Sequence, residues 1–562
     1  MALSRPRTLA RQIALDTVVL GAAGAAAAIL FNFLLDWSGK LFLGRVAGYS
    51  PPGLPSEGGV PIETIGPYGL WLIPIVTMVG GLIVGLITTR FAPEAEGHGT
   101  DSVVRAFHRY GGSMRARVAP IKLLASAITI GSGGSAGREG PIAMIAAALG
   151  SWYADLTHRD ERDRRLLLLV GAAAGISAIF RSPIGASLFV VEVLYADMEF
   201  EAGVLLSATL AAIIAYALAG LVNGFGPLFA VPLPIRPLES KLAYGWYAIL
   251  GLASGLLATA LPMVFYRVRD LFRALRVPPA VKPAIGGFLT GVMAMFLPQL
   301  IGGGYGWMQR AIDGELVFSV LLMLALGKIV AMSLTVGSGG SGGVFAPSLY
   351  VGAMLGGAAA AAGGLPSAPF VIVGMAAVFA GSAHVPFAAM MMVVEMTGGY
   401  ALLVPAALAV SLSYLVQTRL SAAVKYRSLY EAQVRNRAES PAHHTAHLEI
   451  ALQILRDKQV PDLSHLGELD LVSLLRSGVE VDLAEGQRLM VGVLRADSAY
   501  ANTSIGASGR ALAGGGTNII ALLRGEHMVA PRADTILEPG DRLILVASDT
   551  GLEHLRKHFD PW

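Results

Sequence analysis

The stretch that decides the fold is GSGGSAGREGP at Gly131–Pro141, which has a near copy, GSGGSGGVFAP, at Gly337–Pro347. Each copy interrupts a long hydrophobic run whose composition is otherwise that of a membrane helix. The match extends upstream at the same spacing, where Lys122 corresponds to Lys328. Hydrophobic helices that are interrupted at equivalent places in two halves of a membrane protein indicate a substrate site near the middle of the bilayer.

The two loops have the chemistry of an anion site. A helix that starts inside the membrane leaves its first backbone N–H groups without partners. Because hydrocarbon cannot satisfy these groups, they must line an enclosed or wet cavity. The free N–H groups and the positive end of the helix dipole favour an anion. Pro141 and Pro347 suit the first turn of a helix, where an N–H is not needed. The loops therefore predict one site for a small anion.

The composition is that of a membrane protein. Of the 562 residues, 54% are hydrophobic and 14% are charged, which excludes an ordinary soluble enzyme as the main body. Arginines cluster at Arg5–Arg11, Arg105–Arg117 and Arg267–Arg276, and the positive-inside tendency places these segments in the cytoplasm. The sequence has no cysteine, so disulfides and thiolate chemistry are excluded. We expect a multi-pass plasma-membrane transport protein, not an enzyme, with both termini in the cytoplasm.

Apolar runs predict many helices, several of them shorter than the roughly 20 residues that cross a bilayer. The expected helices lie at about 13–35, 69–91, 117–130, 140–155, 166–180, 184–197, 203–222, 243–266, 282–300, 317–336, 345–362, 369–382, 387–398 and 401–418. The repeat continues beyond the loops, because PIGASLFVVE at Pro183–Glu192 is echoed by PFAAMMMVVE at Pro386–Glu395. Short, interrupted and duplicated helices favour a transporter or channel core. The sequence leaves open whether the two halves are inverted.

The motifs also carry a family resemblance. GREGP at Gly137–Pro141 and GVFAP at Gly343–Pro347 resemble the two most characteristic motifs of the CLC chloride channel and transporter family, and Lys122 stands where that family has a lysine. The resemblance covers about residues 10–435. It implies an all-α polytopic membrane fold built from inverted repeats with broken helices, spanning 1–435. It also implies a homodimer with one pore in each subunit.

The resemblance implies which residues hold chloride. Members of the family bind the ion with backbone amides of both motifs and with a tyrosine hydroxyl, and the glutamate of the first motif is their gate. The gate here is Glu139, whose carboxylate can take the place of an anion. The expected chloride-binding residues are His98, Gly99, Arg138, Glu139, Gly140, Val344, Phe345, Ala346 and Tyr430. Chloride is the expected bound and permeant ion, and we expect neither a metal nor an organic cofactor.

Two positions depart from the family pattern. His98, in GHGTD at Gly97–Asp101, replaces a serine whose hydroxyl touches chloride in the family. An imidazole donates N–H groups and titrates near neutral pH, so this change bears on anion selectivity and pH response. Val193 stands where proton-coupled members often have a glutamate. We therefore predict a chloride channel gated by Glu139, with a chloride/proton antiporter of the same fold and a non-conducting membrane ligand sensor as the alternatives.

The character of the chain changes after about Arg435. Residues 436–486 form a predicted polar linker in the cytoplasm. Residues 487–562 contain β-like runs at 489–494, 518–524 and 542–546, separated by turn residues. NIIA at Asn518–Ala521 and PRADTILEPGDRL at Pro531–Leu543 resemble the TrkA-C (RCK-C) regulatory domain, a small α/β fold.

The second resemblance implies a dimerising domain, and some of its members bind cyclic di-AMP. The expected nucleotide contacts are Asn518, Ile519, Ile520, Arg524 and Pro531, and a mononucleotide such as ATP is the second candidate. A ligand-free dimerisation module is the alternative. The expected partners are thus chloride, membrane lipid, a second copy of the chain and this nucleotide, without any nucleic acid polymer.

Overall fold

The computed structural model of the protein describes residues 5–231, 243–437, 440, 442, 481–482, 487–507, 518–524, 527–529, 531–548, 555 and 557–561. The chain divides into two compact units, Met1–Gln433 and Val434–Trp562, and each is described by itself. Most of the predicted linker at 436–486 lies outside the described residues.

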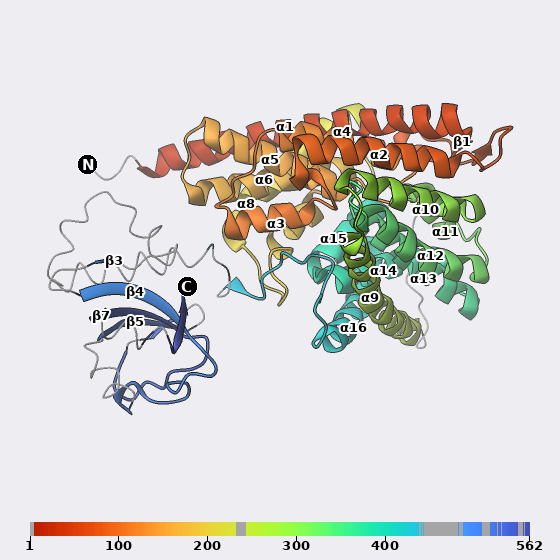
Figure 1. The fold of residues 1–562 in the computed structure, drawn as a ribbon. Coiled ribbons are helices and arrows are strands. Elements are labelled where there is room, and N and C mark those ends of the chain that lie inside the picture. The colour runs from red at the N-terminus through yellow and green to blue at the C-terminus, as the bar shows by residue number, and fades with distance from the viewer. Residues whose placement is uncertain are drawn as a thin grey trace. The chain divides into compact units, whose positions relative to one another are not determined.

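The first unit is a bundle of helices (Figure 1). Its α-helices are α1 (Arg5–Gly39), α2 (Ile73–Phe91), α3 (Thr100–Arg109), α4 (Val118–Gly131), α5 (Glu139–Leu156), α6 (Glu161–Phe180), α7 (Pro183–Glu192), α8 (Ala202–Asn223), α9 (Ala243–Ala274), α10 (Lys282–Phe296), α11 (Tyr305–Ile312), α12 (Phe318–Gly337), α13 (Phe345–Gly363), α14 (Ser367–Ala383), α15 (Pro386–Thr397) and α16 (Leu403–Ser421). A π-helical segment, η1 (Lys40–Ala47), follows α1, and β1 (Tyr49–Ser50) pairs with β2 (Thr64–Ile65).

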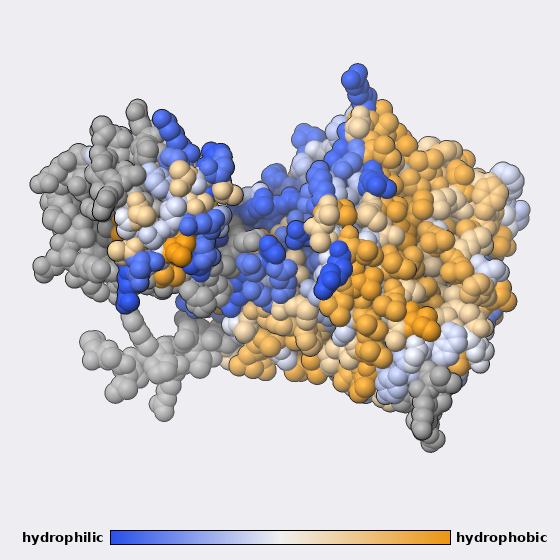
Figure 2. Space-filling model, turned by 90° about the horizontal axis from the view of Figure 1, so that it is seen from below, coloured by the Kyte–Doolittle hydropathy of each residue, from blue (hydrophilic) through white to orange (hydrophobic). Residues whose placement is uncertain are grey.

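Eight segments of the described chain are long and apolar enough to cross a membrane. They lie at Ala14–Ala47, Ile73–Phe91, Ala202–Asn223, Tyr244–Ala274, Pro279–Phe296, Phe318–Gly337, Phe345–Gly363 and Tyr400–Ser421. Four shorter apolar helices, α4, α7, α14 and α15, lie among them. Figure 2 shows a broad apolar surface on the first unit, as burial in lipid requires. The predicted apolar runs therefore correspond to helices of a membrane protein.

The two halves of this unit are inverted repeats. Helix α5 packs against α6 as α13 packs against α14, and α2 packs against its counterpart α10. The Gly-Ser loops meet where Gly137 and Gly343 exchange two backbone hydrogen bonds, with N···O distances of 2.7 and 2.6 Å. The Ser135 N–H donates to the Thr335 hydroxyl, and in the same way the Ser341 N–H donates to the Thr129 hydroxyl. This reciprocity places a local two-fold axis between the loops.

Two short helices were not expected from the sequence. Helices α3 and α11 are short and are more polar than the other helices of the core, so they carry no hydrophobic signal. Each begins directly after a glycine with positive φ, Gly99 at 86° and Gly304 at 79°. These glycines turn the chain sharply into the helix, a conformation that other residues rarely adopt. The repeat therefore contains a second pair of helix starts beside the Gly-Ser loops.

The described part of the second unit is a sheet with antiparallel pairing (Figure 1). Its strands are β3 (Val481–Asp482), β4 (Gln487–Leu494), β5 (Asn518–Arg524), β6 (His527–Val529), β7 (Arg542–Ser548) and β8 (Phe559–Pro561). The order is β3-β4-β7-β5-β6, and β8 pairs with β4. Leu522, Leu543 and Leu545 are fully buried in its core. The three predicted β-like runs are the central strands β4, β5 and β7.

Candidate functional site

Three helix starts converge around backbone that leaves no room for side chains. Helix α3 begins after Gly99, α5 begins at Glu139 and α13 begins at Phe345. A Cβ added to Gly140 would lie 2.0 Å from the His98 carbonyl oxygen, and one added to Gly99 would lie 2.7 Å from the Gly140 carbonyl oxygen. Real Cβ atoms do not approach oxygen so closely. Glycine at these positions therefore lets the positive ends of the helices come together, which favours an anion between them.

The Glu139 side chain lies across this convergence. It is 2% exposed, and its Oε2 accepts a hydrogen bond from the Ala346 N–H in the first turn of α13, at 3.3 Å. Its Oε1 accepts a hydrogen bond from the Tyr305 hydroxyl at the start of α11. A carboxylate on α5 thus uses an N–H group of α13 that a free anion would otherwise use. The predicted gate is in contact with the predicted anion-binding backbone.

The start of α13 is fixed by aromatic packing. Phe345 is 3% exposed, and its ring centroid lies 4.0 Å from that of Phe379 and 4.6 Å from that of Phe180. Val344 is also buried, at 1% exposure. Neither side chain is polar, so these residues can serve an anion only through their backbone. Their packing holds the N–H groups of α13 in one orientation.

His98 and Tyr430 form the next part of the site. Their ring centroids are 5.6 Å apart, and both residues are buried. The His98 Nδ1 and the Tyr430 hydroxyl are polar atoms without a hydrogen-bond partner among the described residues. A buried polar group without a partner is costly, so such atoms indicate a missing ligand. A tyrosine hydroxyl can donate a hydrogen bond to an anion, so Tyr430 is a candidate contact for one.

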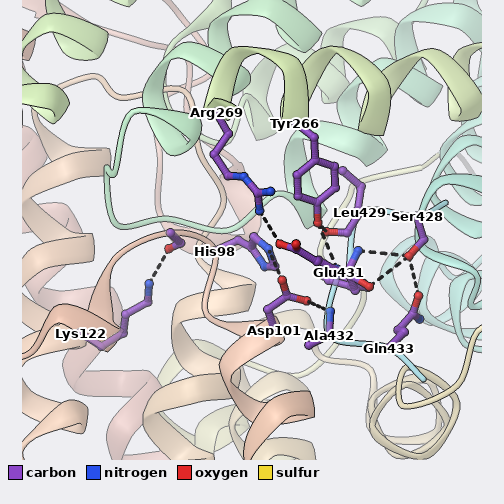
Figure 3. A network of polar contacts seen from close by, with 12 residues as sticks. His98, Asp101, Lys122, Tyr266, Arg269, Ser428, Leu429, Glu431, Ala432 and Gln433 are labelled. Atoms are coloured by element: carbon purple, nitrogen blue, oxygen red, sulfur yellow. Dashed lines mark hydrogen bonds and ion pairs between the residues drawn. The ribbon is translucent and has the colours of Figure 1, made fainter. Parts of the chain in front are cut away.

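The second ring nitrogen of His98, Nε2, has a carboxylate partner (Figure 3). Its Nε2 lies 3.4 Å from Asp101 Oδ2, and Asp101 Oδ1 accepts a hydrogen bond from the Ala432 N–H at 3.1 Å. This carboxylate favours the tautomer that carries its proton on Nε2. Asp101 thus links the His98 ring to the backbone at Ala432.

Buried lysines hold the two loops that precede α3 and α11. Lys122 Nζ donates to the carbonyl oxygens of Ala95 and Gly97, at 3.0 and 2.6 Å. Lys328 Nζ donates to those of Leu300 and Gly302, at 2.8 and 2.7 Å. The corresponding lysines of the two repeats thus make equivalent hydrogen bonds to backbone carbonyl oxygens, and both are fully buried. Each ammonium fixes a loop that ends at the anion site.

Clefts lead to the site from two places. One, of about 670 Å³, is lined by Arg138 and by the loop 302–305, and so reaches the residues around Glu139. The other, of about 340 Å³, is lined by His98, Asp101 and several basic side chains, namely Arg105, Arg269, Arg273 and Lys282. His98 thus lines the second cleft, and Arg138 and Tyr305, which neighbour Glu139, line the first.

Arg138 does not point its charge at the anion site. Its Nη2 lies 2.6 Å from Glu57 Oε1, its Nη1 donates to Asn32 Oδ1, and its guanidinium carbon lies 4.8 Å from the centroid of the Tyr305 ring. The guanidinium of the motif at 137–141 is therefore bound to neighbouring side chains. That Arg138 contributes to chloride binding stays a prediction, and its guanidinium is held by these partners.

Sequence reasoning missed Tyr305. Its signal is weak but present, because GGGY at 302–305 precedes Lys328 at nearly the distance at which GHGT at 97–100 precedes Lys122. Two glycines and a positive φ at the second define both helix starts. A comparison of the two halves upstream of the lysines would have found it.

The predicted nucleotide contacts in the second unit have other partners in the structure. Arg524 donates from Nε and Nη2 to the two Asp541 carboxylate oxygens, at 2.9 and 2.8 Å, and from Nη1 to Glu538 Oε1, at 2.6 Å. The hydrogen bonds with Asp541 raise the pKa of Arg524 above its usual value. Ile519 packs against the core, and Pro531 is exposed. The side chains of Asn518 and Ile520 are not among those that the structure describes. Arg524 is therefore paired within its own unit, and its contact with a nucleotide phosphate stays a prediction.

Comparison with known proteins agrees with this geometry. Residues 80–418 match the family model for the voltage-gated chloride channel, which is the CLC family. The chain belongs to this family. Residues 490–560 match the TrkA-C domain. The H(+)/Cl(−) exchange transporter ClcA of Vibrio campbellii is 31% identical over 350 residues, which are 60% of this chain and 74% of that protein. The protein of the same name from Salmonella agona is 30% identical over 354 residues, 60% of this chain and 73% of that protein.

Solved structures show the same fold in this CLC protein. A slow cyanobacterial Cl−/H+ antiporter has a TM-score of 0.62 at 23% identity, covering 75% of this chain and 96% of the antiporter. A CLC-type fluoride/proton antiporter has a TM-score of 0.64 at 21% identity, covering 76% and 98%. These coverages include the membrane unit, and they establish its inverted-repeat architecture. The chain is thus a membrane ion transporter or channel of the CLC family with a TrkA-C region.

Proposed function

We propose that this CLC protein exchanges chloride for protons across the plasma membrane, with Glu139 as the group that both blocks the anion pathway and carries the proton. The observation that supports this most directly is the Glu139 carboxylate, which accepts the Ala346 N–H at 3.3 Å and is 2% exposed. The relatives described above that carry the name of exchange transporter support the choice of exchange over passive conduction.

The mechanism follows from competition for the same donors. When Glu139 is ionised, its negative charge is favoured at the convergent helix starts and excludes a free anion. Protonation removes this charge, so the carboxyl loses its advantage and chloride gains the N–H groups of α5 and α13. Loss of the proton to the opposite side returns the carboxylate and expels the anion. One proton binding event and anion movement are thereby linked through a single side chain.

A passive chloride channel is the second candidate, and Val193 favours it. Val193 follows Glu192 and is 3% exposed, and its side chain cannot carry a proton. The adjacent Glu192 carboxylate accepts hydrogen bonds from the Phe387 and Ala388 N–H groups, at 3.1 and 2.7 Å. These bonds engage Glu192 in a structural contact. In a channel, protonation of Glu139 from one side would open the pathway without net proton transport.

Flux in liposomes separates the two functions. Purified protein is reconstituted, a chloride gradient is imposed, and external pH is recorded with a proton electrode. For an exchanger, the chloride gradient drives protons against their own gradient, and Glu139→Gln abolishes this movement while chloride flux persists. Dissipative chloride flux without uphill proton movement in the wild-type protein would establish the channel. Absence of chloride flux altogether would favour a membrane ligand sensor.

We also propose that two copies form the working unit and that the TrkA-C region binds a regulatory nucleotide, with cyclic di-AMP as the first candidate. The match at 490–560 supports a ligand-binding region of this class. Because Arg524 is paired within its own unit, a ligand would have to displace Glu538 or bind elsewhere on the sheet. Calorimetry on the full-length protein with cyclic di-AMP, and with ATP for comparison, tests the ligand. Light scattering in detergent tests the dimer, and saturable binding to neither nucleotide would favour a ligand-free dimerisation module.

A further inference from the structure

Tyr305 joins the gate to the wall of the larger cleft. It is the first residue of α11, and its hydroxyl donates to Glu139 Oε1. Its ring lies against the Arg138 guanidinium, at 4.8 Å from the guanidinium carbon, and near Phe229, at 6.2 Å between ring centroids. The hydroxyl is therefore presented to the carboxylate by a ring that is held on more than one side.

The backbone that carries Tyr305 is also fixed. Gly304, directly before it, has a φ of 79° and turns the chain into α11. Lys328 donates to the Leu300 and Gly302 carbonyl oxygens, at 2.8 and 2.7 Å, and so secures the same loop from beneath. A donor that is held in place before it meets its acceptor loses little entropy when the bond forms. The Tyr305 hydroxyl is thus a preorganised partner for Glu139.

A hydroxyl distinguishes between the two states of the gate. It donates a strong, charge-assisted hydrogen bond to an ionised carboxylate and a weaker one to a neutral acid. Glu139 is 2% exposed, so water competes little for its carboxylate and the difference between the two states is larger than in water. Tyr305 therefore favours the ionised, blocking state of Glu139 over the protonated state.

We propose that Tyr305 is a positioning residue that holds ionised Glu139 in the blocking position and so sets the pH at which the pathway opens. This inference rests on the proposed role of Glu139 as the gate. It concerns a residue outside the motifs at 137–141 and 343–347.

Other charges face Glu139, and they remain constant in the test. In the described chain, the charged and titratable groups that act on Glu139 are Arg138, Tyr305, Lys328 and Tyr430. Arg138 is held by Glu57, and Lys328 is held by two carbonyl oxygens. Replacing tyrosine with phenylalanine at 305 removes the hydroxyl and leaves the ring on which Arg138 lies. Its effect on the gate therefore reports the hydrogen bond.

The test is chloride efflux from liposomes as a function of pH. Tyr305→Phe is expected to move the midpoint of the flux-against-pH curve upward by about one pH unit, the equivalent of one charge-assisted hydrogen bond. Flux at neutral pH should rise accordingly. In a Glu139→Gln background, Tyr305→Phe should change neither flux nor its pH dependence. The matched control is Tyr49→Phe, which removes another buried hydroxyl at the same cleft, one that donates to Glu63 at 2.9 Å. It should leave the midpoint unchanged.

A second variant keeps the test valid if Tyr305→Phe does not fold. Fluorotyrosine at position 305 keeps the size of the side chain but makes the phenol a stronger donor, so the midpoint should move downward. An unchanged midpoint in the folded phenylalanine variant, or in the fluorotyrosine protein where the former does not fold, would overturn the role of Tyr305. The role of Glu139 as the gate is tested separately, in a Glu139→Gln, His98→Ala double variant that lacks both groups. Loss of the pH dependence of flux in this variant leaves the gate intact, whereas retained pH dependence would overturn the proposed function and this inference together.

Discussion

Glu192 and Glu395 each cap the start of the helix that carries the other residue. The Glu192 carboxylate, at the end of α7, accepts two N–H groups of the first turn of α15, with N···O distances of 3.1 and 2.7 Å. The Glu395 carboxylate, near the end of α15, accepts two N–H groups of the first turn of α7, at 3.2 and 2.8 Å, and also the Ser182 hydroxyl. These contacts satisfy helix starts that would otherwise be unpaired inside the protein. The duplicated FVVE and VVE segments therefore make a structural clasp between the halves.

Removing one member of this clasp should destabilise the protein. Glu192→Ala leaves two buried N–H groups without an acceptor, and the expected loss is about 1–3 kcal/mol in the free energy of unfolding. Glu395→Ala should lower the free energy of unfolding by at least as much, because it also removes the acceptor of the Ser182 hydroxyl. Thermal unfolding in detergent measures the effect, with Glu315→Ala as a control at a more exposed carboxylate. Wild-type stability in both buried variants would show that water replaces the caps.

His98 should contribute to anion binding. Its Nδ1 is buried and has no hydrogen-bond partner among the described residues. His98→Ala should weaken chloride binding, measured by calorimetry, by up to about tenfold, the equivalent of one net hydrogen bond. His98→Ser restores the residue type of the family and should retain most of the affinity. Equal chloride affinity in His98→Ala and the wild-type protein would assign the ring to packing against Tyr430.

Lys122 should matter for anion binding although it does not contact the site. Its ammonium holds the Ala95 and Gly97 carbonyl oxygens, and Gly97 directly precedes His98. Lys122→Met keeps most of the side-chain volume but frees this loop. We expect chloride affinity to fall by about tenfold, the equivalent of one lost net hydrogen bond. Lys40→Met is the control, because Lys40 is exposed and pairs only with Asp36 among the described residues. Equal affinity in both variants would contradict the role of Lys122.

Arg524 should act as a stabilising residue of the second unit. Asp541 has a side-chain exposure of 1%, and Arg524→Ala leaves its carboxylate without the guanidinium. We expect local destabilisation of about 2 kcal/mol, seen as faster hydrogen exchange in β5 and β7 of the full-length protein. Arg495→Ala is the matched control, because its partner Asp497 is largely exposed, and its exchange should be unchanged. Slow exchange in Arg524→Ala would return this residue to the candidates for ligand contact.

Much of the membrane unit could be predicted because its signals are local. Continuous apolar runs predicted the helices, and the near copies at 131–141 and 337–347 predicted one anion site formed by both halves. The β-like runs of the second unit were found for the same reason, since alternation and turn residues lie within a few positions of each other. Helices α3 and α11 were missed, because short polar helices have no hydrophobic signal and depend on partners elsewhere in the chain.

The partners of two arginines could not be predicted for a related reason. A guanidinium at Arg138 or Arg524 could bind an anion as far as local sequence shows, but each has carboxylate partners far away in the chain, Glu57 for the first and Asp541 for the second. Long side chains choose among all acceptors within reach of the folded backbone. Such choices follow from three-dimensional packing rather than from a motif.

The sequence by itself determined that this is a duplicated membrane protein whose broken helices form an anion site, with Glu139 at one helix start. Residue type and spacing suffice for that conclusion, because lipid forces any helix break to be satisfied inside the protein. Only the tertiary structure decided that the repeats are inverted, that Tyr305 meets Glu139 and that Glu192 and Glu395 cap opposite halves. These contacts join residues that are more than 150 positions apart in the chain, and their geometry exists only once the two repeats have packed around their common axis.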